Sequence, residues 1–157
     1  MSETLEEVAA ECDRATREAR DKLVATVRQA HRDGLSQREI ARRTGRSQPE
    51  VSRLIRFHGT GPLARKLRAH RDEVIRIIED AGGTNVRVFG SVATGKEREG
   101  SDIDLLADLS ATELTLFDLE RLQRQVADAV GAPVDLTPDS GLRPYLRDRV
   151  LAEASPL

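Results

Sequence analysis

Two aspartates in the second half of the chain have the spacing of a metal-binding pair. Asp102 and Asp104 are separated by one residue at the start of an apolar run, residues 103–109, that predicts a β-strand. Because side chains alternate along a strand, both carboxylates face the same side, while Ile103 points into the core. Two carboxylates this close repel each other unless a cation lies between them, and Mg²⁺ prefers such oxygen ligands. The pair therefore predicts a magnesium site.

A glycine–serine pair and a third aspartate can complete this site. Gly90 and Ser91 follow a short predicted strand, residues 85–88. Glycine lets the backbone approach a phosphate closely, the N–H groups of the next turn can receive it, and Ser91 adds a hydroxyl. Asp135 lies between two apolar residues of a third predicted strand, residues 134–136, and so faces away from the core. A third carboxylate can hold the metal that activates an attacking hydroxyl, and can accept its proton.

A second motif lies earlier in the chain. Helices are predicted over residues 37–43 and from 48 to about 57. A serine precedes each helix, and a glutamate stands three residues after that serine, which is a capping-box pattern. Gly45 lies in the turn between them, and Ala41 is small enough for two helices to cross there. The stretch GLSQREIARRTGRSQPEVSRLIRF resembles the helix-turn-helix of bacterial transcription regulators. The alternative is a helical hairpin used only for packing or dimerisation.

The helix-turn-helix resemblance implies two sets of DNA contacts. Residues of the second helix would face the major groove, and arginines around it would meet phosphates. The expected base-facing residues are Ser47, Gln48, Ser52 and Arg53, and the expected phosphate-binding residues are Arg38, Arg42, Arg43, Arg46 and Arg56.

The charge distribution agrees with two different tasks. The 157-residue chain has a net charge of −2, but residues 28–68 hold eleven basic and three acidic residues, whereas residues 99–157 hold twelve acidic and five basic. A basic segment can attract a polyanion, and an acidic one can hold metal cations. The acidic N-terminus resembles no signal peptide and no apolar run has the length of a membrane span, so we expect a soluble, cytoplasmic protein.

The remaining pattern predicts an α+β chain of two small domains. Helices are expected over residues 3–32, 63–80, 114–130 and 142–154. The helix over residues 3–32 is long enough to pack on a second copy of the chain or to lie along its own chain. The only cysteine of the sequence, Cys12, lies on the apolar stripe of this helix and is expected to be buried. Two glycines and a proline make residues 59–62 the predicted linker. The predicted domains are a helical DNA-binding domain over residues 1–58 and a small domain over residues 63–157 with a short mixed sheet flanked by helices.

The order Gly-Ser, spacer, Asp-x-Asp and a later carboxylate resembles the DNA polymerase β-like nucleotidyltransferase superfamily, from about residue 63 to 157. The nearest look-alike is the minimal nucleotidyltransferase group, whose ending the tail PVDLTPDSGLRPYLRDRVLAEASPL also resembles. The resemblance implies that Gly90 and Ser91 hold the triphosphate of ATP, that Asp102 and Asp104 bind two Mg²⁺ ions, and that Asp135 is the third catalytic carboxylate. AMP would pass to a hydroxyl of a partner protein.

The same resemblance implies a biological role. It suggests an antitoxin that adenylylates a HEPN-type RNase toxin, with the helix-turn-helix binding operator DNA to autoregulate the operon, and with assembly as a homodimer or hetero-oligomer. Three alternatives stay open: a transcription regulator whose second domain only senses nucleotide or is inactive, a toxin that modifies RNA 3′ ends, and an aminoglycoside-type nucleotidyltransferase. The absence of an added substrate domain argues against the last.

Overall fold

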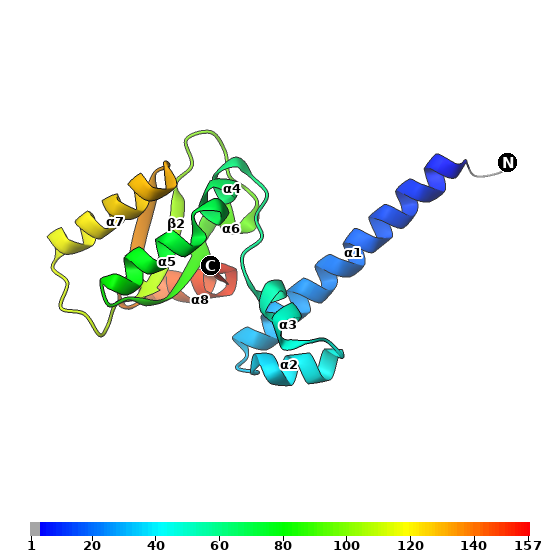
Figure 1. Cartoon of the computed structure of the whole chain (residues 1–157), viewed down its shortest axis with the longest axis horizontal. Helices are drawn as coiled ribbons and strands as arrows, with labels where there is room; N and C mark the ends of the chain where they lie inside the picture. The colour runs from blue at the N-terminus through cyan, green and yellow to red at the C-terminus, as the bar shows by residue number, and fades with distance from the viewer. Residues whose placement is uncertain (1–3) are drawn as a thin grey trace. The chain divides into compact units, whose positions relative to one another are not determined.

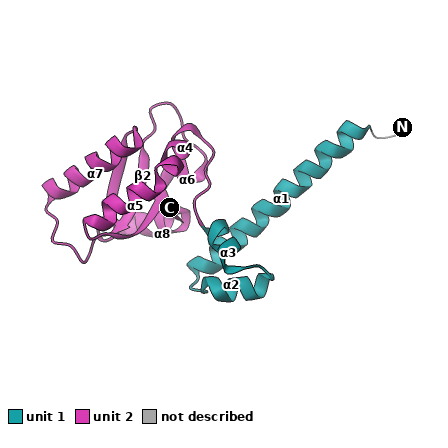
Figure 2. Cartoon of the chain, in the orientation of Figure 1, with its two compact units in different colours: residues 1–55 teal, residues 56–157 magenta. Residues whose placement is uncertain are grey.

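The computed structural model describes residues 4–157, which form an α+β structure as predicted. The elements follow in the order α1 (Leu5–Arg32), α2 (Gln37–Thr44), α3 (Gln48–Ile55), α4 (Pro62–Ala69), α5 (Arg71–Asp80), β1 (Thr84–Phe89), α6 (Gly90–Thr94), β2 (Ile103–Asp108), α7 (Leu116–Val130), β3 (Val134–Pro138), a 3₁₀ turn η1 (Asp139–Gly141), α8 (Pro144–Glu153) and β4 (Ser155–Pro156) (Figure 1). The chain divides into two compact units, residues 1–55 and residues 56–157 (Figure 2). None of the helices within residues 4–157 is long and apolar enough to cross a membrane.

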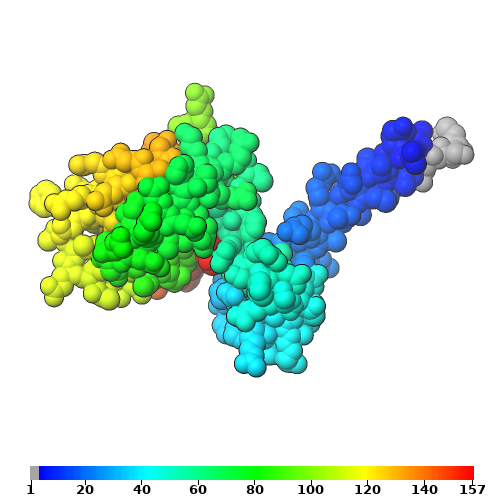
Figure 3. Space-filling model, in the orientation of Figure 1, coloured from blue at the N-terminus to red at the C-terminus, as the bar shows by residue number. Residues whose placement is uncertain are grey.

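The first unit packs the second half of α1 against α2 and α3. Its core contains the buried side chains Val27, Ile40, Ala41, Val51, Leu54 and Ile55. By contrast, the side chains of α1 up to Lys22 are exposed, and Figure 3 shows this half as a single uncovered helix. Cys12 lies in that half and is exposed, so the expectation that it is buried is wrong. The predicted first residue of the helix, Glu3, lies outside the described residues.

The turn between α2 and α3 follows the capping rules read from the sequence. Gly45 ends α2 with φ of 64°, a left-handed conformation in which glycine carries no Cβ penalty. The Ser47 hydroxyl accepts a hydrogen bond from the Glu50 N–H, and the Glu50 carboxylate accepts one from the Ser47 N–H at 2.7 Å. This reciprocal cap begins α3 at the expected residue. The local sequence therefore accounts for where α2 ends and where α3 begins.

The end of α3 differs from the expectation that this helix continues to about residue 57. Ile55 is the last helical residue and is buried in the core of the first unit. Phe57 is instead buried in the core of the second unit, where its N–H donates to the carbonyl of Pro156 at 2.7 Å. Tertiary packing of Phe57 therefore stops the helix, and the division between the units falls between these two side chains.

The second unit is built on a four-stranded mixed sheet with strand order β3-β2-β1-β4. Strand β1 is antiparallel to both β2 and β4, whereas β2 and β3 are parallel. Alternate side chains face helices α5 and α7, which lie side by side over one face (Figure 1). The buried strand residues on that face are Val86, Val88, Ile103, Leu105, Ala107, Val134 and Leu136. The other face carries Arg87, Asp104 and Asp135 together with the buried side chain of Leu106.

Two features of the second unit differ from the sequence pattern. The single helix expected over residues 63–80 is broken at His70, whose φ of −112° lies outside the helical range. The break lets α4 pack near α6 and β2 while α5 packs on β1 and α7. The two-residue strand β4 was not predicted, because so short a segment becomes a strand only through its pairing with Arg87 and Val88.

Candidate functional site

The carboxylates of Asp104 and Asp135 are brought together by the parallel pair of strands. Asp104 on β2 and Asp135 on β3 are direct partners in the ladder, so their side chains leave neighbouring strands on the same face. Asp102 lies two residues before Asp104, just outside β2, and is exposed. The strand pairing therefore places the three predicted carboxylates at one end of the sheet.

The glycine–serine pair lies at the same end of the sheet. Because β1 runs antiparallel to β2, its last residue, Phe89, pairs with Asp104, and the chain then turns at Gly90. Gly90 has φ of +71°, and a Cβ atom at this position would overlap the Asp104 carboxylate. Both facts require glycine here: the first for the turn, the second for the close approach of the backbone to the acid. Ser91 follows in the first turn of α6 and is partly buried.

The pKa of Asp104 reports how crowded this acidic cluster is. Partial burial, with the negative charges of Asp135 and Asp102 adding to it, raises the pKa of Asp104 from 3.8 to about 6. A nearby positive charge stabilises the ionised form of a carboxylate in such surroundings. A divalent cation would relieve the repulsion, and this chemistry fits the predicted magnesium ligands.

The protein side chains by themselves do not form a complete cage for an ion. Within residues 4–157, no three His, Cys, Asp or Glu side chains are grouped so as to hold a metal. Mg²⁺ commonly takes only one or two carboxylates from the protein and its other ligands from water and substrate phosphates. The donor set of Asp102, Asp104 and Asp135 fits an ion that arrives with a nucleotide.

One charged pair on this face was missed by the sequence reasoning. Arg87 lies on β1 opposite Leu106, on the same face as Asp104, and donates to Asp139 at 2.8 Å. The two side chains are only 13% and 25% exposed, so this ion pair is largely shielded from solvent. Asp139 follows the last residue of β3 and neutralises Arg87 at the middle of the sheet, away from the end that carries Asp102. An alternating arginine in β1 was the available signal, but its partner is 52 residues away.

The predicted DNA contacts lie in two different environments in the first unit. Gln48 and Arg53 on α3 are exposed, and Ser52 is partly buried. Ser47 is engaged as the cap of α3, because its hydroxyl also lies 3.0 Å from the Glu50 carboxylate. This cap leaves Gln48 and Arg53 as the most accessible of the predicted base-facing residues.

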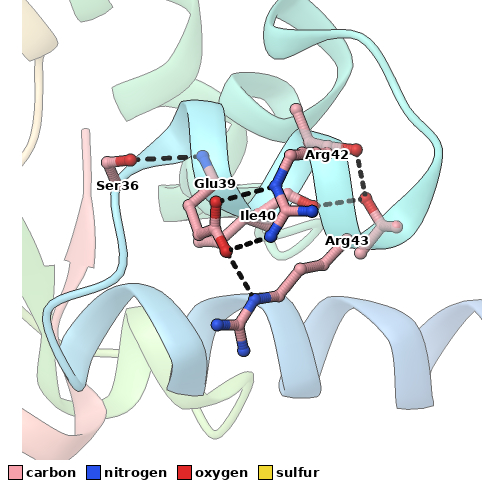
Figure 4. A network of polar contacts seen from close by, with 7 residues as sticks. Ser36, Glu39, Ile40, Arg42 and Arg43 are labelled. Carbon is pink, nitrogen blue, oxygen red and sulfur yellow. Dashed lines mark hydrogen bonds and ion pairs between the residues drawn. The ribbon is translucent and has the colours of Figure 1, made fainter.

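An ion-pair network holds part of the basic surface of α2 (Figure 4). Glu39 accepts hydrogen bonds from Arg42 at 2.7 Å and from Arg43 at 2.8 Å, while its own N–H is capped by Ser36. Because Glu39 hydrogen-bonds to both arginines, its pKa falls to about 2. Arg46 is exposed and donates to the carbonyl of Thr44. The network fixes Arg42 and Arg43 on one side of α2.

The titration of Asp104 gives a test of the cluster. Because its pKa is raised on folding, the folded chain binds more protons than the unfolded chain between pH 3.8 and about 6, so stability falls as pH rises through this window. Without divalent cations, carbon-13 NMR should show Asp104 titrating near pH 6. In Asp135→Asn its pKa should fall but stay above 3.8, because burial, the largest cause, remains. An ordinary value in the wild-type protein would contradict the geometry.

Comparison with known proteins identifies the domain that contains these residues. A family model described as a nucleotidyltransferase domain matches residues 67–156. A Methanocaldococcus jannaschii protein, named as a candidate protein adenylyltransferase, is 34% identical over 82 residues, which is 52% of this chain and 87% of the relative. The protein adenylyltransferase MntA of Thermococcus cleftensis is 33% identical over 87 residues, 55% of this chain and 84% of the relative.

A solved structure shares the fold of the same region. It is described as a candidate minimal nucleotidyltransferase and has 44% sequence identity and a TM-score of 0.53, over 59% of this chain and 94% of that chain. The family match lies wholly within the second unit and covers more than half of the chain. The chain therefore belongs to the nucleotidyltransferase domain family and is a nucleotidyltransferase.

Proposed function

We propose that the chain transfers AMP from ATP, with Mg²⁺, to a hydroxyl group of a partner protein. The observation that carries this proposal is the close approach of Gly90 to Asp104, at the end of the sheet where Asp102 and Asp135 add their charges. The two relatives named as protein adenylyltransferases support the nucleotide and the class of acceptor, and the chain covers 87% and 84% of their lengths.

Each residue of the site has a role in the proposed reaction. Bound Mg²⁺ would neutralise the triphosphate and lower the pKa of the acceptor hydroxyl. Asp102 and Asp104 hold the metal, while Gly90 and Ser91 orient the phosphates through the backbone and the hydroxyl. Asp135 takes the proton of the acceptor hydroxyl. The hydroxyl oxygen bonds to the α-phosphorus, the bond from that phosphorus to the bridging oxygen breaks, and pyrophosphate leaves. Catalysis is then mostly positioning and charge neutralisation.

The proposed acceptor is a toxin of the HEPN-type RNase class, which would make the chain an antitoxin. This part follows from the resemblance to minimal nucleotidyltransferases. A second candidate function is a regulator whose nucleotidyltransferase domain senses ATP, and the pair of helices α2 and α3 favours it. Turnover of ATP separates the two, because a sensor binds ATP without releasing pyrophosphate.

The first unit is proposed to bind operator DNA. The exposed side chains of Gln48 and Arg53 suit adenine and guanine edges, and residues 28–55 of this unit hold seven basic residues against three acidic ones. One such unit reads few bases, so useful specificity would come from two copies on a palindromic site, with the chain as a homodimer or in a hetero-oligomer with the toxin.

Replacing a metal-binding carboxylate should abolish transfer without unfolding the protein. With Mg²⁺, α-labelled ATP and the protein encoded beside it as acceptor, the wild-type chain should label that acceptor. Asp102→Asn and Asp104→Asn should each lower the rate roughly 10²–10³-fold, because they remove charge that acts on the reacting phosphates. Asp128→Asn, an exposed change on α7, is the matched control and should leave the rate unchanged. Full labelling by Asp104→Asn would refute the proposal.

Two glycine substitutions should separate backbone strain from damage to the site. Gly90 and Gly95 have φ of +71° and +75°, so Gly90→Ala and Gly95→Ala should each cost about 1–2 kcal/mol of unfolding free energy. Only Gly90→Ala pushes a Cβ into the Asp104 carboxylate, while at Gly95 nothing lies within 4 Å. Transfer should fall about 100-fold in the first variant alone, given a displacement of the order of 1 Å. Equal activities of the two would show that this contact does not matter.

DNA binding should depend on α3. Fluorescence anisotropy with DNA from upstream of the gene should show about 10-fold weaker specific binding for Arg53→Ala, because one bidentate base contact is lost. Arg46→Ala should weaken binding to all DNA sequences alike. It should also reduce the slope of log affinity against log salt concentration by about one. Arg124→Ala, which changes an exposed side chain on α7 of the other unit, is the control. Unchanged affinity of Arg53→Ala would leave α2 and α3 as a packing hairpin.

A further inference from the structure

Glu97 makes a contact that the proposed reaction does not explain. It lies in the loop of residues 95–102 that joins α6 to β2, and its carboxylate accepts hydrogen bonds from the N–H groups of Leu63, at 2.9 Å, and Ala64, at 3.3 Å. These are donors of the first turn of α4, which begins at Pro62 and has no side-chain cap of its own. A helix start needs such acceptors, and a negative charge there is favourable. Glu97 thus caps a helix more than thirty residues away in sequence.

The chain leaves room for this contact at Gly61. The backbone of Gly61 has φ of −64° and ψ of 168°, which any residue can adopt, so its conformation does not require glycine. A Cβ atom at Gly61 would, however, overlap the Glu97 carboxylate. Glycine at the cap position of α4 therefore serves the contact with the loop, because a serine or aspartate at that position would displace Glu97.

The loop depends on this contact for its position. The Lys96 N–H donates to Ser91 and the Arg98 N–H donates to Ser101, and both bonds are local to the loop and its ends. A cavity of about 500 Å³ borders residues 97–101, so packing does not support the loop on that side. Helix α4, by contrast, is firmly seated, with Ala64 and Leu67 fully buried. Glu97 joins the loop to this fixed helix.

We propose that Glu97 is a positioning residue for nucleotidyl transfer, holding the loop on α4 so that Asp102 keeps its place relative to Ser91. Asp102 joins this loop to β2, whose ladder begins at Ile103, so a shift of the loop would move its carboxylate. Ser91 lies in α6, which leads into the same loop. Glu97 contacts neither Ser91 nor Asp102 and acts through the loop between them. This inference rests on the role proposed above for Asp102.

A pair of variants separates positioning from simple helix capping. Glu97→Ala removes the cap and the loop anchor together. Glu97→Ala combined with Gly61→Asp gives α4 a cap of its own in the space that Glu97 vacates, but leaves the loop detached. If Glu97 positions the loop, the double variant should recover most of the lost thermal stability, while kcat stays about 10-fold or more below wild type and KM for ATP changes little. Recovery of kcat together with stability would overturn the proposal.

Limited proteolysis gives a readout that does not depend on activity. Lys96 and Arg98 flank Glu97 and are exposed, so trypsin can cut the loop when it opens. Cleavage there should be about 10-fold faster in both Glu97→Ala and the double variant, since tenfold corresponds to about 1.4 kcal/mol, the order of one hydrogen bond to a charged group. Glu99→Ala, an exposed glutamate of the same loop, is the matched control and should match the wild-type chain in rate and kcat.

The kinetic and proteolysis measurements test different proposals. A double variant whose loop resists trypsin as well as the wild-type chain would overturn the anchoring role of Glu97. A wild-type chain that transfers no nucleotide would instead refute the proposed function, and the proteolysis comparison would still decide whether Glu97 holds the loop.

Discussion

Electrostatic repulsion among three carboxylates is the constraint on which the second unit depends. Partial burial, and after it the charges of Asp135 and Asp102, raises the pKa of Asp104, and a cation shared by the three groups would favour their ionised forms. The sheet supplies the rigidity that keeps them together: β2 and β3 are parallel and in register, and Asp104 and Asp135 are partners across the ladder. A slip of one residue would turn either side chain to the opposite face, into the apolar core.

Strand β1 supplies the side of this arrangement that is proposed to bind phosphate. Antiparallel β1 ends beside Asp104, and only a glycine with positive φ can turn the chain there without a Cβ meeting the acid. The loop that returns the chain from this turn to Asp102 is long and glycine-containing, and a bond to α4 compensates for its freedom. The geometry of the site thus combines a rigid ladder with one anchored loop.

Charge is unevenly distributed along the chain: residues 28–68 hold eleven basic and three acidic residues, and residues 99–157 hold twelve acidic and five basic. A basic segment lowers the cost of approaching a polyanion, and an acidic segment concentrates divalent cations. The junction between the two compact units is short: Ile55 is buried in one core, and Phe57 in the other. Residues 59–62, predicted as the linker, belong to the second compact unit, where Gly61 lies close to the Glu97 carboxylate.

Much of the site could be predicted from the sequence because its determinants are local. The alternation around Asp102 and Asp104, the glycine–serine turn and the serine caps of α2 and α3 are fixed by periods and spacings within a few residues. The break at His70 was not predictable in this way, because both halves of residues 63–80 continue one apolar stripe. The same limit applies to the exposure of Cys12, since an apolar stripe does not reveal whether anything covers it.

The amino-acid sequence by itself determined the residue types of the candidate site, their order along the chain and the two short helices joined by a turn in the first unit. The tertiary structure alone decided which distant groups meet: Arg87 with Asp139, Phe57 with Pro156, and Glu97 with the start of α4. The physical reason is that a periodic pattern specifies which face a side chain takes. Its partner, tens of residues away, is set only when the strands and helices pack.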